Sequence, residues 1–144
     1  MSVPAEVIAN YFLAAPDLEA GEGVSNLKLQ KLCYYAQGLH LAVFDVPLFP
    51  ESIEAWAHGP GVPSLYHKFK GHGAYPIPAP DELDLSGLSA DSQDLLGEVW
   101  EAYGQFSAWK LRDMSHETPP WKDCAAGAVI TTSAMKAYFK QLVD

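Results

Sequence analysis

The stretch from Ser25 to Phe44 constrains the fold of this chain more than any other. Its twenty residues, SNLKLQKLCYYAQGLHLAVF, lack proline and carry apolar side chains at most positions. A run of this length favours a helix over a strand, because most strands have only about three to ten residues. The apolar side chains spread over a wide arc, which is typical of a helix that other elements surround. We therefore predict a buried helix at the centre of the fold.

Polar groups interrupt this apolar stretch at a few positions. Lys28 and Lys31 are one turn apart, and we expect them to mark the only edge that faces water or a partner. Tyr34 and Tyr35 point about 100° apart on a helix, so at most one is expected in the core. His40 is expected to be a core histidine that bonds to the backbone, since buried polar groups are usually hydrogen-bonded.

Hydrophobic spacing and turn residues locate the other helices. One helix is predicted before Pro16, and a loop is expected from Pro16 to Val24, where glycines and acids gather. Further helices are predicted over 63–69, from Ser89, from Ser107 and in the C-terminal segment, where apolar residues recur at steps of three and four.

One segment, Ser52 to Ala57, alternates apolar and polar residues and predicts a short strand. A lone strand leaves its backbone groups unpaired, so we expect a partner either in Ala128–Thr132 or in the Tyr75–Ile77 arm. The expected fold is mainly α: a single compact helical domain over residues 1–144, built around a central buried helix, with a small two-stranded β element.

The charge of the chain bears on its partners. It has 18 Asp and Glu residues but only nine Lys and Arg residues, so the net charge of -9 reflects a shortage of bases. This composition argues against nucleic-acid binding, which depends on Lys and Arg to neutralise phosphates. Residues 71–109 contain seven acids and no Lys or Arg, a pattern that fits either a solvated helix face or a docking surface for a basic protein.

Targeting and cysteine signals are sparse. Cys33 and Cys124 are the only cysteines, and they form neither a disulfide framework nor a metal-binding spacing. The N-terminal segment has no basic region of the kind that begins a signal peptide, and no run of eighteen apolar residues occurs. We expect a cytoplasmic protein with no membrane partner.

No motif in the sequence indicates catalysis. The five histidines are not arranged as HExxH or at any spacing that places two metal ligands on one helix face. Neither a GxSxG motif nor a glycine-rich phosphate loop occurs. We therefore expect no enzyme activity, no metal and no cofactor. A hydrolase that uses Cys33, His58 or His116 is an alternative that rests only on the presence of these residues.

Three motifs in order, NLKLQKLCYYAQGLHLAVF, PLFPESIEAWAHGPGVPSLYHKFK and SAWKLRDMSHETPPW, carry a family resemblance. The chain resembles the Panacea domain family of SocA-like antitoxins, a phage-associated protein family, from roughly Asn10 to Trp121 and in the closing helix. It departs from the family where a valine commonly follows the Gly-Pro pair, because it has Gly61. The matching positions are Lys28, Gln30, Lys31, Tyr34, Tyr35, His58, Gly59, Pro60, Tyr66, Trp109, His116 and Trp121.

The resemblance implies a mainly α-helical antitoxin of a toxin–antitoxin system. Such a protein would neutralise a cognate protein toxin, encoded by the adjacent gene, by direct protein–protein interaction. The alternative that the same family implies is a proteolytic adaptor that delivers the toxin to a cytoplasmic AAA+ protease. Tyr and Trp are enriched at interface hot spots, although core filling explains them equally well. The candidate partner-binding residues are Lys28, Lys31, Tyr34, Tyr35, Trp56, His58, Tyr66, Trp109, His116 and Trp121.

Overall fold

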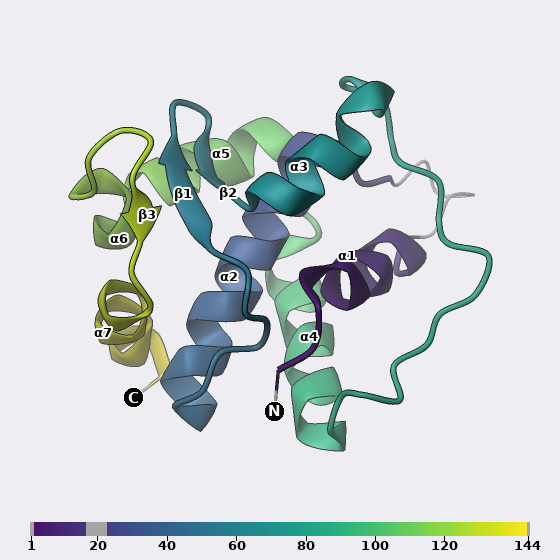
Figure 1. Ribbon diagram of the computed structural model, residues 1–144, viewed down its shortest axis with the longest axis horizontal. Coiled ribbons are helices and arrows are strands. Elements are labelled where there is room, and N and C mark those ends of the chain that lie inside the picture. The colour runs from purple at the N-terminus through teal and green to yellow at the C-terminus, as the bar shows by residue number, and fades with distance from the viewer. Residues whose placement is uncertain (1, 17–22, 144) are drawn as a thin grey trace.

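The computed structural model describes residues 2–16 and 23–143 and is mainly helical (Figure 1). Most of the loop predicted between Pro16 and Val24 lies outside the described residues. The elements are α1 (Ala5–Ala14), α2 (Asn26–Phe44), β1 (Ile53–Trp56), β2 (Gly59–Gly61), α3 (Pro63–Phe69), the 3₁₀ turn η2 (Lys70–His72), α4 (Ala90–Tyr103), α5 (Ala108–His116), α6 (Pro119–Lys122), β3 (Val129–Ile130) and α7 (Thr132–Val143).

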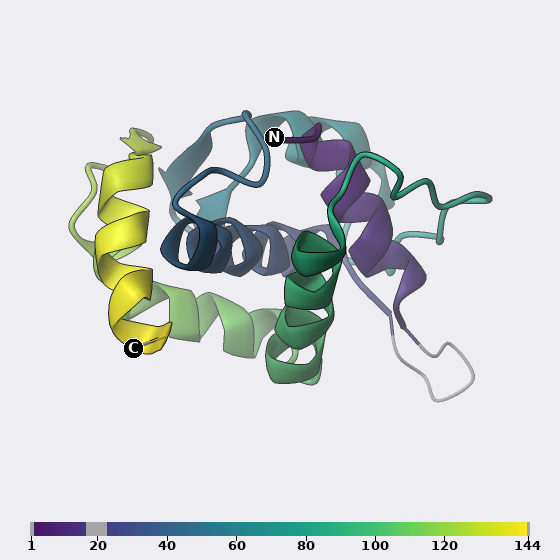
Figure 2. The same cartoon turned by 90° about the horizontal axis from the view of Figure 1, so that it is seen from below.

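Helix α2 is the centre of the molecule. It is contacted by α1, α3, α4, α5, α7 and β2, and the view from below shows it enclosed between α7 on one side and α1 on the other (Figure 2). Most of its residues are buried on every face. The prediction of a mainly α fold around a buried central helix is confirmed.

Local signals set the two ends of α2. The Ser25 hydroxyl accepts a hydrogen bond from the backbone N–H of Lys28 at 3.3 Å, which satisfies one of the free donors at a helix N-terminus. At the other end Asp45 adopts a left-handed conformation with φ 63°, and its N–H bonds to the carbonyl of Leu41. These caps explain why the helix ends where the apolar run ends.

Gly38 in the middle of α2 allows α7 to approach closely. A Cβ atom at this position would overlap the ring of Phe139, a fully buried residue of α7. The same ring packs edge-on against Tyr34, with centroids 5.5 Å apart. The glycine therefore lowers the helix propensity of α2 but allows the aromatic contact between α2 and α7, the last helix.

The β element is a three-stranded antiparallel sheet in the order β2-β1-β3. Ile53 of β1 pairs with Ile130 of β3, so the predicted partner at 128–132 is confirmed. The 75–77 arm was the wrong alternative, because the N–H of Ile77 bonds to the carbonyl of Val24 instead. Strand β2 is additional to the two strands expected, since its sequence Gly-Pro-Gly has no side-chain alternation for a pattern to detect.

Candidate partner-binding site

The polar side chains of α2 bond to the segments that cover it. Gln30 accepts a hydrogen bond from the N–H of Val62 at 2.7 Å and donates to the side-chain oxygen of Asn26 at 2.8 Å. Asn26 in turn donates to the carbonyl of Tyr66 at 3.2 Å. Buried amides with such partners fix neighbouring segments in place. This chain of bonds ties the β1–β2 hairpin and α3 to the N-terminal half of α2.

Lys31 is buried, with only 1% of its surface exposed, and its Nζ donates to the carbonyl of Pro60 at 2.8 Å. The expectation that Lys31 faces water is therefore wrong, because the hairpin covers it, although the side chain still forms part of the wall of a pocket. Burial, which removes the ammonium from water, and to a lesser extent the nearby Arg112 cation together lower its pKa from 10.5 to about 7. The lysine is poised between its charged and neutral forms near neutral pH.

The hairpin needs glycine where it crosses Lys31. Gly59 has φ 104°, and a Cβ atom there would lie 2.6 Å from Cε of Lys31 and 2.8 Å from Oγ of Ser115. Two residues later, a Cβ atom at Gly61 would overlap the indole of Trp56. Gly61 thus makes room for Trp56 to lie against the hairpin.

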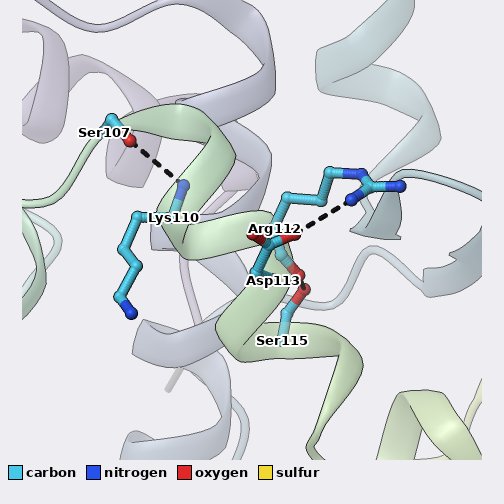
Figure 3. Close-up of polar contacts among 5 residues, drawn as sticks. All are labelled: Ser107, Lys110, Arg112, Asp113 and Ser115. Atoms are coloured by element: carbon cyan, nitrogen blue, oxygen red, sulfur yellow. Dashed lines mark hydrogen bonds and ion pairs between the residues drawn. The ribbon is translucent and has the colours of Figure 1, made fainter.

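Helix α5 packs against both α2 and β2, on the side of the hairpin where Ser115 and Lys31 both lie next to Gly59. Figure 3 shows the polar contacts within α5. Ser107 caps it by accepting a hydrogen bond from the N–H of Lys110 at 3.1 Å. At its other end the Ser115 hydroxyl donates to the carbonyl of Arg112 at 2.7 Å. Both bonds are local, and they present the side chains of α5 to the hairpin in a fixed orientation.

Arg112 is the cation of α5 nearest this region. Its Nη1 lies 2.9 Å from Oδ1 of Asp113, and its guanidinium carbon lies 5.3 Å from the ring centre of Trp109 (Figure 3 shows the pair with Asp113). Within the described part of the chain, its buried Nε has no hydrogen-bond partner. Arg112 therefore adds positive charge beside Lys31 and supports Trp109 at the surface.

A pocket of about 330 Å³ opens between the hairpin, α2, α3, η2 and α5. Three aromatic side chains stand around it: Trp56 packs edge-on against Tyr66 with centroids 5.2 Å apart, and Trp109 lies near His58 at 6.4 Å. Trp109 is 60% exposed and Tyr66 is 41% exposed. The lining residues are Asn26, Leu27, Gln30, Lys31, Trp56, His58, Tyr66, Lys70, Gly73, Ala74 and Trp109.

The pocket brings together half of the residues predicted for partner binding. All five line this one cavity, although they come from four segments: α2, the β1–β2 hairpin, α3 and α5. These residues are Lys31, Trp56, His58, Tyr66 and Trp109. The other five candidates lie elsewhere. Their positions show what each of them contributes to the fold.

Tyr34 and Tyr35 are both buried, so the expectation that at most one lies in the core is wrong. The Tyr34 hydroxyl shares a 2.7 Å hydrogen bond with the hydroxyl of Thr118, and Tyr35 stacks on Tyr103 with centroids 4.2 Å apart. Burial raises the pKa of both phenols. Neighbours cover α2 on several sides, and two side chains 100° apart can therefore both be enclosed.

Lys28 is tied to the C-terminal end of α4. Its Nζ donates to the carbonyl of Gly104 at 2.6 Å and lies 5.5 Å from the ring centre of Trp100. A lysine at the end of a helix stabilises the free carbonyls there. Its described contacts are thus structural.

His116 and Trp121 stack face to face, with centroids 4.0 Å apart and ring planes 6° from parallel. The Trp121 indole N–H donates to the carbonyl of Trp56 at 2.8 Å. Burial, followed by the charges of Arg112 and Lys31, lowers the pKa of His116 and favours the neutral imidazole. This pair supports β1 from outside the pocket.

Sequence reasoning missed several polar residues that hold the site. Asn26 and Gln37 stand in an apolar run, and that placement is the signal that could have identified them as buried amides. Gln37 accepts from the N–H of Leu48 at 2.6 Å and donates to the carbonyl of Phe49 at 2.8 Å. Lys70 gave no signal, because its place in the pocket depends on how η2 folds back toward α2.

His40 and Cys33 both lie in the core. His40 bonds to the carbonyl of Val46 at 2.7 Å and to the Ser92 hydroxyl at 2.9 Å, so the core histidine is confirmed. Cys33 is fully buried, which raises the pKa of its thiol and disfavours the reactive thiolate. Among residues 2–16 and 23–143, no group of His, Cys, Asp and Glu could hold a metal ion, and no helix could cross a membrane.

Comparisons with known proteins show what the chain is similar to. The family described as "Antitoxin SocA-like, Panacea domain" matches residues 29–122. A curated relative, "Antitoxin SocA" of Caulobacter vibrioides (strain NA1000 / CB15N), is 36% identical over 140 residues, which cover 88% of this chain and 72% of the relative. No solved structure matches. The matched span contains the hairpin, α3 and α5, and so most of the pocket.

Proposed function

Because the chain belongs to the SocA-like antitoxin family with a Panacea domain, we propose that it is an antitoxin that neutralises a cognate protein toxin by binding it directly. The main support for this proposal is that the relative named "Antitoxin SocA" aligns with most of the chain. The toxin would be the product of the adjacent gene, and neutralisation would take place in the cytoplasm.

Two surface features support a binding role. The first is the aromatic pocket, where Trp109 and Tyr66 expose large side chains of the kind that dominate binding energies. The second is an acidic stripe on α4, made of Asp91, Asp94, Glu98 and Glu101. All four side chains are exposed and lie within roughly 80° of one another on the helix.

The acidic stripe works against the stability of α4. Its members are three or four residues apart, and like charges at this spacing destabilise a helix by about 0.2–0.5 kcal/mol per pair. Within the described residues, none of the four forms an ion pair. A one-sign surface of this type accelerates association with a basic protein. We therefore assign the stripe to steering of the toxin and the aromatic surface to contact with it.

Co-expression tests the proposal. The adjacent gene is expressed alone and together with this chain, and growth is measured. Toxicity that disappears only in the co-expressing cells, together with co-purification of the two proteins, is the expected result. A neighbour that is harmless alone, or toxic in both strains, would refute it. Rescue that vanishes in a protease-deficient host would favour the adaptor alternative over direct neutralisation.

Charge reversal tests the steering role. Replacing Asp94 and Glu98 with lysine should slow association with the toxin about tenfold at low salt and flatten its salt dependence, while dissociation changes little. The control carries the same change in net charge at Glu117 and Asp123, two exposed acids outside the stripe. Surface plasmon resonance at several salt concentrations measures both rates. Equal association rates for the two variants would exclude the stripe as the steering surface.

A further inference from the structure

The pocket has the opposite charge character from the rest of the molecule. The chain carries 18 acids and nine bases, yet the eleven lining residues include Lys31, Lys70 and His58 and no Asp or Glu. Two acids that contact neighbours of the pocket are already paired, since Glu54 accepts a hydrogen bond from the Trp56 indole at 3.0 Å and Asp113 pairs with Arg112. An anionic group entering this cavity meets no like charge on its walls.

Lys31 reaches this cavity with hydrogen-bonding capacity to spare. An ammonium group has three donors, and the described residues offer its Nζ one acceptor, the carbonyl of Pro60. No described acid forms an ion pair with it. A buried cation without a counter-ion is costly, and a carboxylate at hydrogen-bond distance would offset that cost. Arg112 on the neighbouring helix adds positive charge from the other side.

The aromatic walls of the pocket indicate what kind of molecule carries the anionic group. Trp56, Tyr66 and Trp109 line the cavity with aromatic rings, and its volume of about 330 Å³, at the small end of the range for ligand pockets, is large enough for a Glu or Asp side chain. The exposed faces of Trp109 and Tyr66 extend the apolar surface beyond the cavity. A free small molecule inside the pocket would leave these faces uncovered, whereas residues flanking an acidic side chain in a polypeptide would cover them.

We propose that this pocket anchors the partner protein through a Glu or Asp side chain of an acidic-apolar segment, with Lys31 as the buried counter-ion and Trp56, Tyr66 and Trp109 around the neighbouring apolar residues. The inference rests on the proposed function, because it names the part of the toxin that this chain holds. The contact is opposite in sign to the α4 stripe, so the two surfaces would together fix the orientation of the partner.

A peptide pair tests the pocket without knowledge of the toxin. The full chain labelled with ¹⁵N is titrated with acetyl-Leu-Glu-amide and with acetyl-Leu-Gln-amide, which differ only in charge. The indole N–H signals of Trp56 and Trp109 should move, while that of Trp100, which packs near Lys28, should not. The Glu peptide should bind roughly tenfold more tightly than the Gln peptide. Equal binding of the two peptides, or equal movement of Trp100, would overturn the proposal.

Variants identify the counter-ion. Lys31→Met should bind the Glu and Gln peptides with about equal affinity. Trp109→Ala changes an exposed residue and should lower the affinity for both peptides. Lys140→Gln on α7 is the charge-matched control and should bind as the natural chain does. An unchanged preference in Lys31→Met would exclude Lys31 as the counter-ion. The spectrum of each variant reports directly whether the fold is retained.

Co-expression separates this inference from the proposed function. If the natural chain and Lys31→Met rescue cells equally well, the antitoxin role stands and the anchoring pocket is refuted. If the natural chain fails to rescue, the antitoxin role and the anchoring of a toxin both fail, and the peptide titration still reports whether the pocket takes a carboxylate. Rescue by the natural chain and Lys140→Gln, with loss of rescue in folded Lys31→Met, supports both.

Discussion

Replacing Lys31 with methionine should make the free protein more stable while impairing its binding. Methionine keeps the length of the buried stem and removes the ammonium group that burial and Arg112 disfavour. The loss is the hydrogen bond from Nζ to the carbonyl of Pro60, which is worth about 1 kcal/mol. The gain is larger, because a charged group no longer has to leave water when the chain folds.

The pKa of Lys31 sets the size and the pH window of this gain. Its pKa falls from 10.5 in the unfolded chain to about 7 in the folded protein, a difference worth at most about 5 kcal/mol. Between these values the unfolded chain holds one more proton, so stability rises with pH at up to about 1.4 kcal/mol per pH unit. The stability that the natural chain gains from a neutral Lys31 is fully present above pH 10.5 and is lost as the pH falls to about 7. The advantage of Lys31→Met should therefore be greatest at and below pH 7.

Urea unfolding of both chains at pH 6, 7, 8 and 9, followed by tryptophan fluorescence, measures the effect. The difference between the two chains cancels the other titrating groups, which they share. From pH 7 to pH 9 the natural chain should gain about 2–3 kcal/mol relative to Lys31→Met. Parallel stability curves for the two chains over this range would refute the reasoning, because they would show that Lys31 does not change its protonation on folding.

Two further substitutions test the packing and the hydrogen bonds of α2. Gly38→Ala favours the helix by about 1 kcal/mol through its higher helix propensity. It should nevertheless lower the free energy of unfolding by about 1–3 kcal/mol, because the new methyl group overlaps the Phe139 ring. Thermal unfolding shows whether the substitution stabilises or destabilises the protein. Gln37→Leu should cost about 2–4 kcal/mol, because it leaves the N–H of Leu48 and the carbonyl of Phe49 buried without their partners. A loss of less than about 1 kcal/mol in urea unfolding would show that these bonds contribute little.

Local signals made the helices predictable. Ser25, Ser89 and Ser107 each accept a hydrogen bond from the N–H three residues on, and the apolar spacing after each cap identifies the buried face. The short helix α6 was not predicted, because its sequence Pro-Pro-Trp-Lys is too short to show helical periodicity. Strand β2 was missed for a similar reason, since it is recognisable only by its pairing with β1.

The candidate site was less predictable, because it is assembled from distant segments. A lysine in a sequence is normally assigned to the surface, and the carbonyl that buries Lys31 belongs to Pro60, 29 residues further along the chain. The aromatic residues Trp56, Tyr66 and Trp109 were selected by type, but only the folding of α3 and α5 against the hairpin brings them around one cavity. Residue type identified the chemistry, and non-local packing decided its location.

The contact between Phe139 and Gly38 links the durability of this protein to its last helix. If α7 detached, the aromatic rings of Tyr34 and Tyr35 would lose the ring that packs against them, and the middle of α2 would meet solvent. Local openings of this kind are where proteases gain access to a folded chain. Opening of α7 would then influence how long the protein survives proteolysis in the cell, and so how long any partner remains bound.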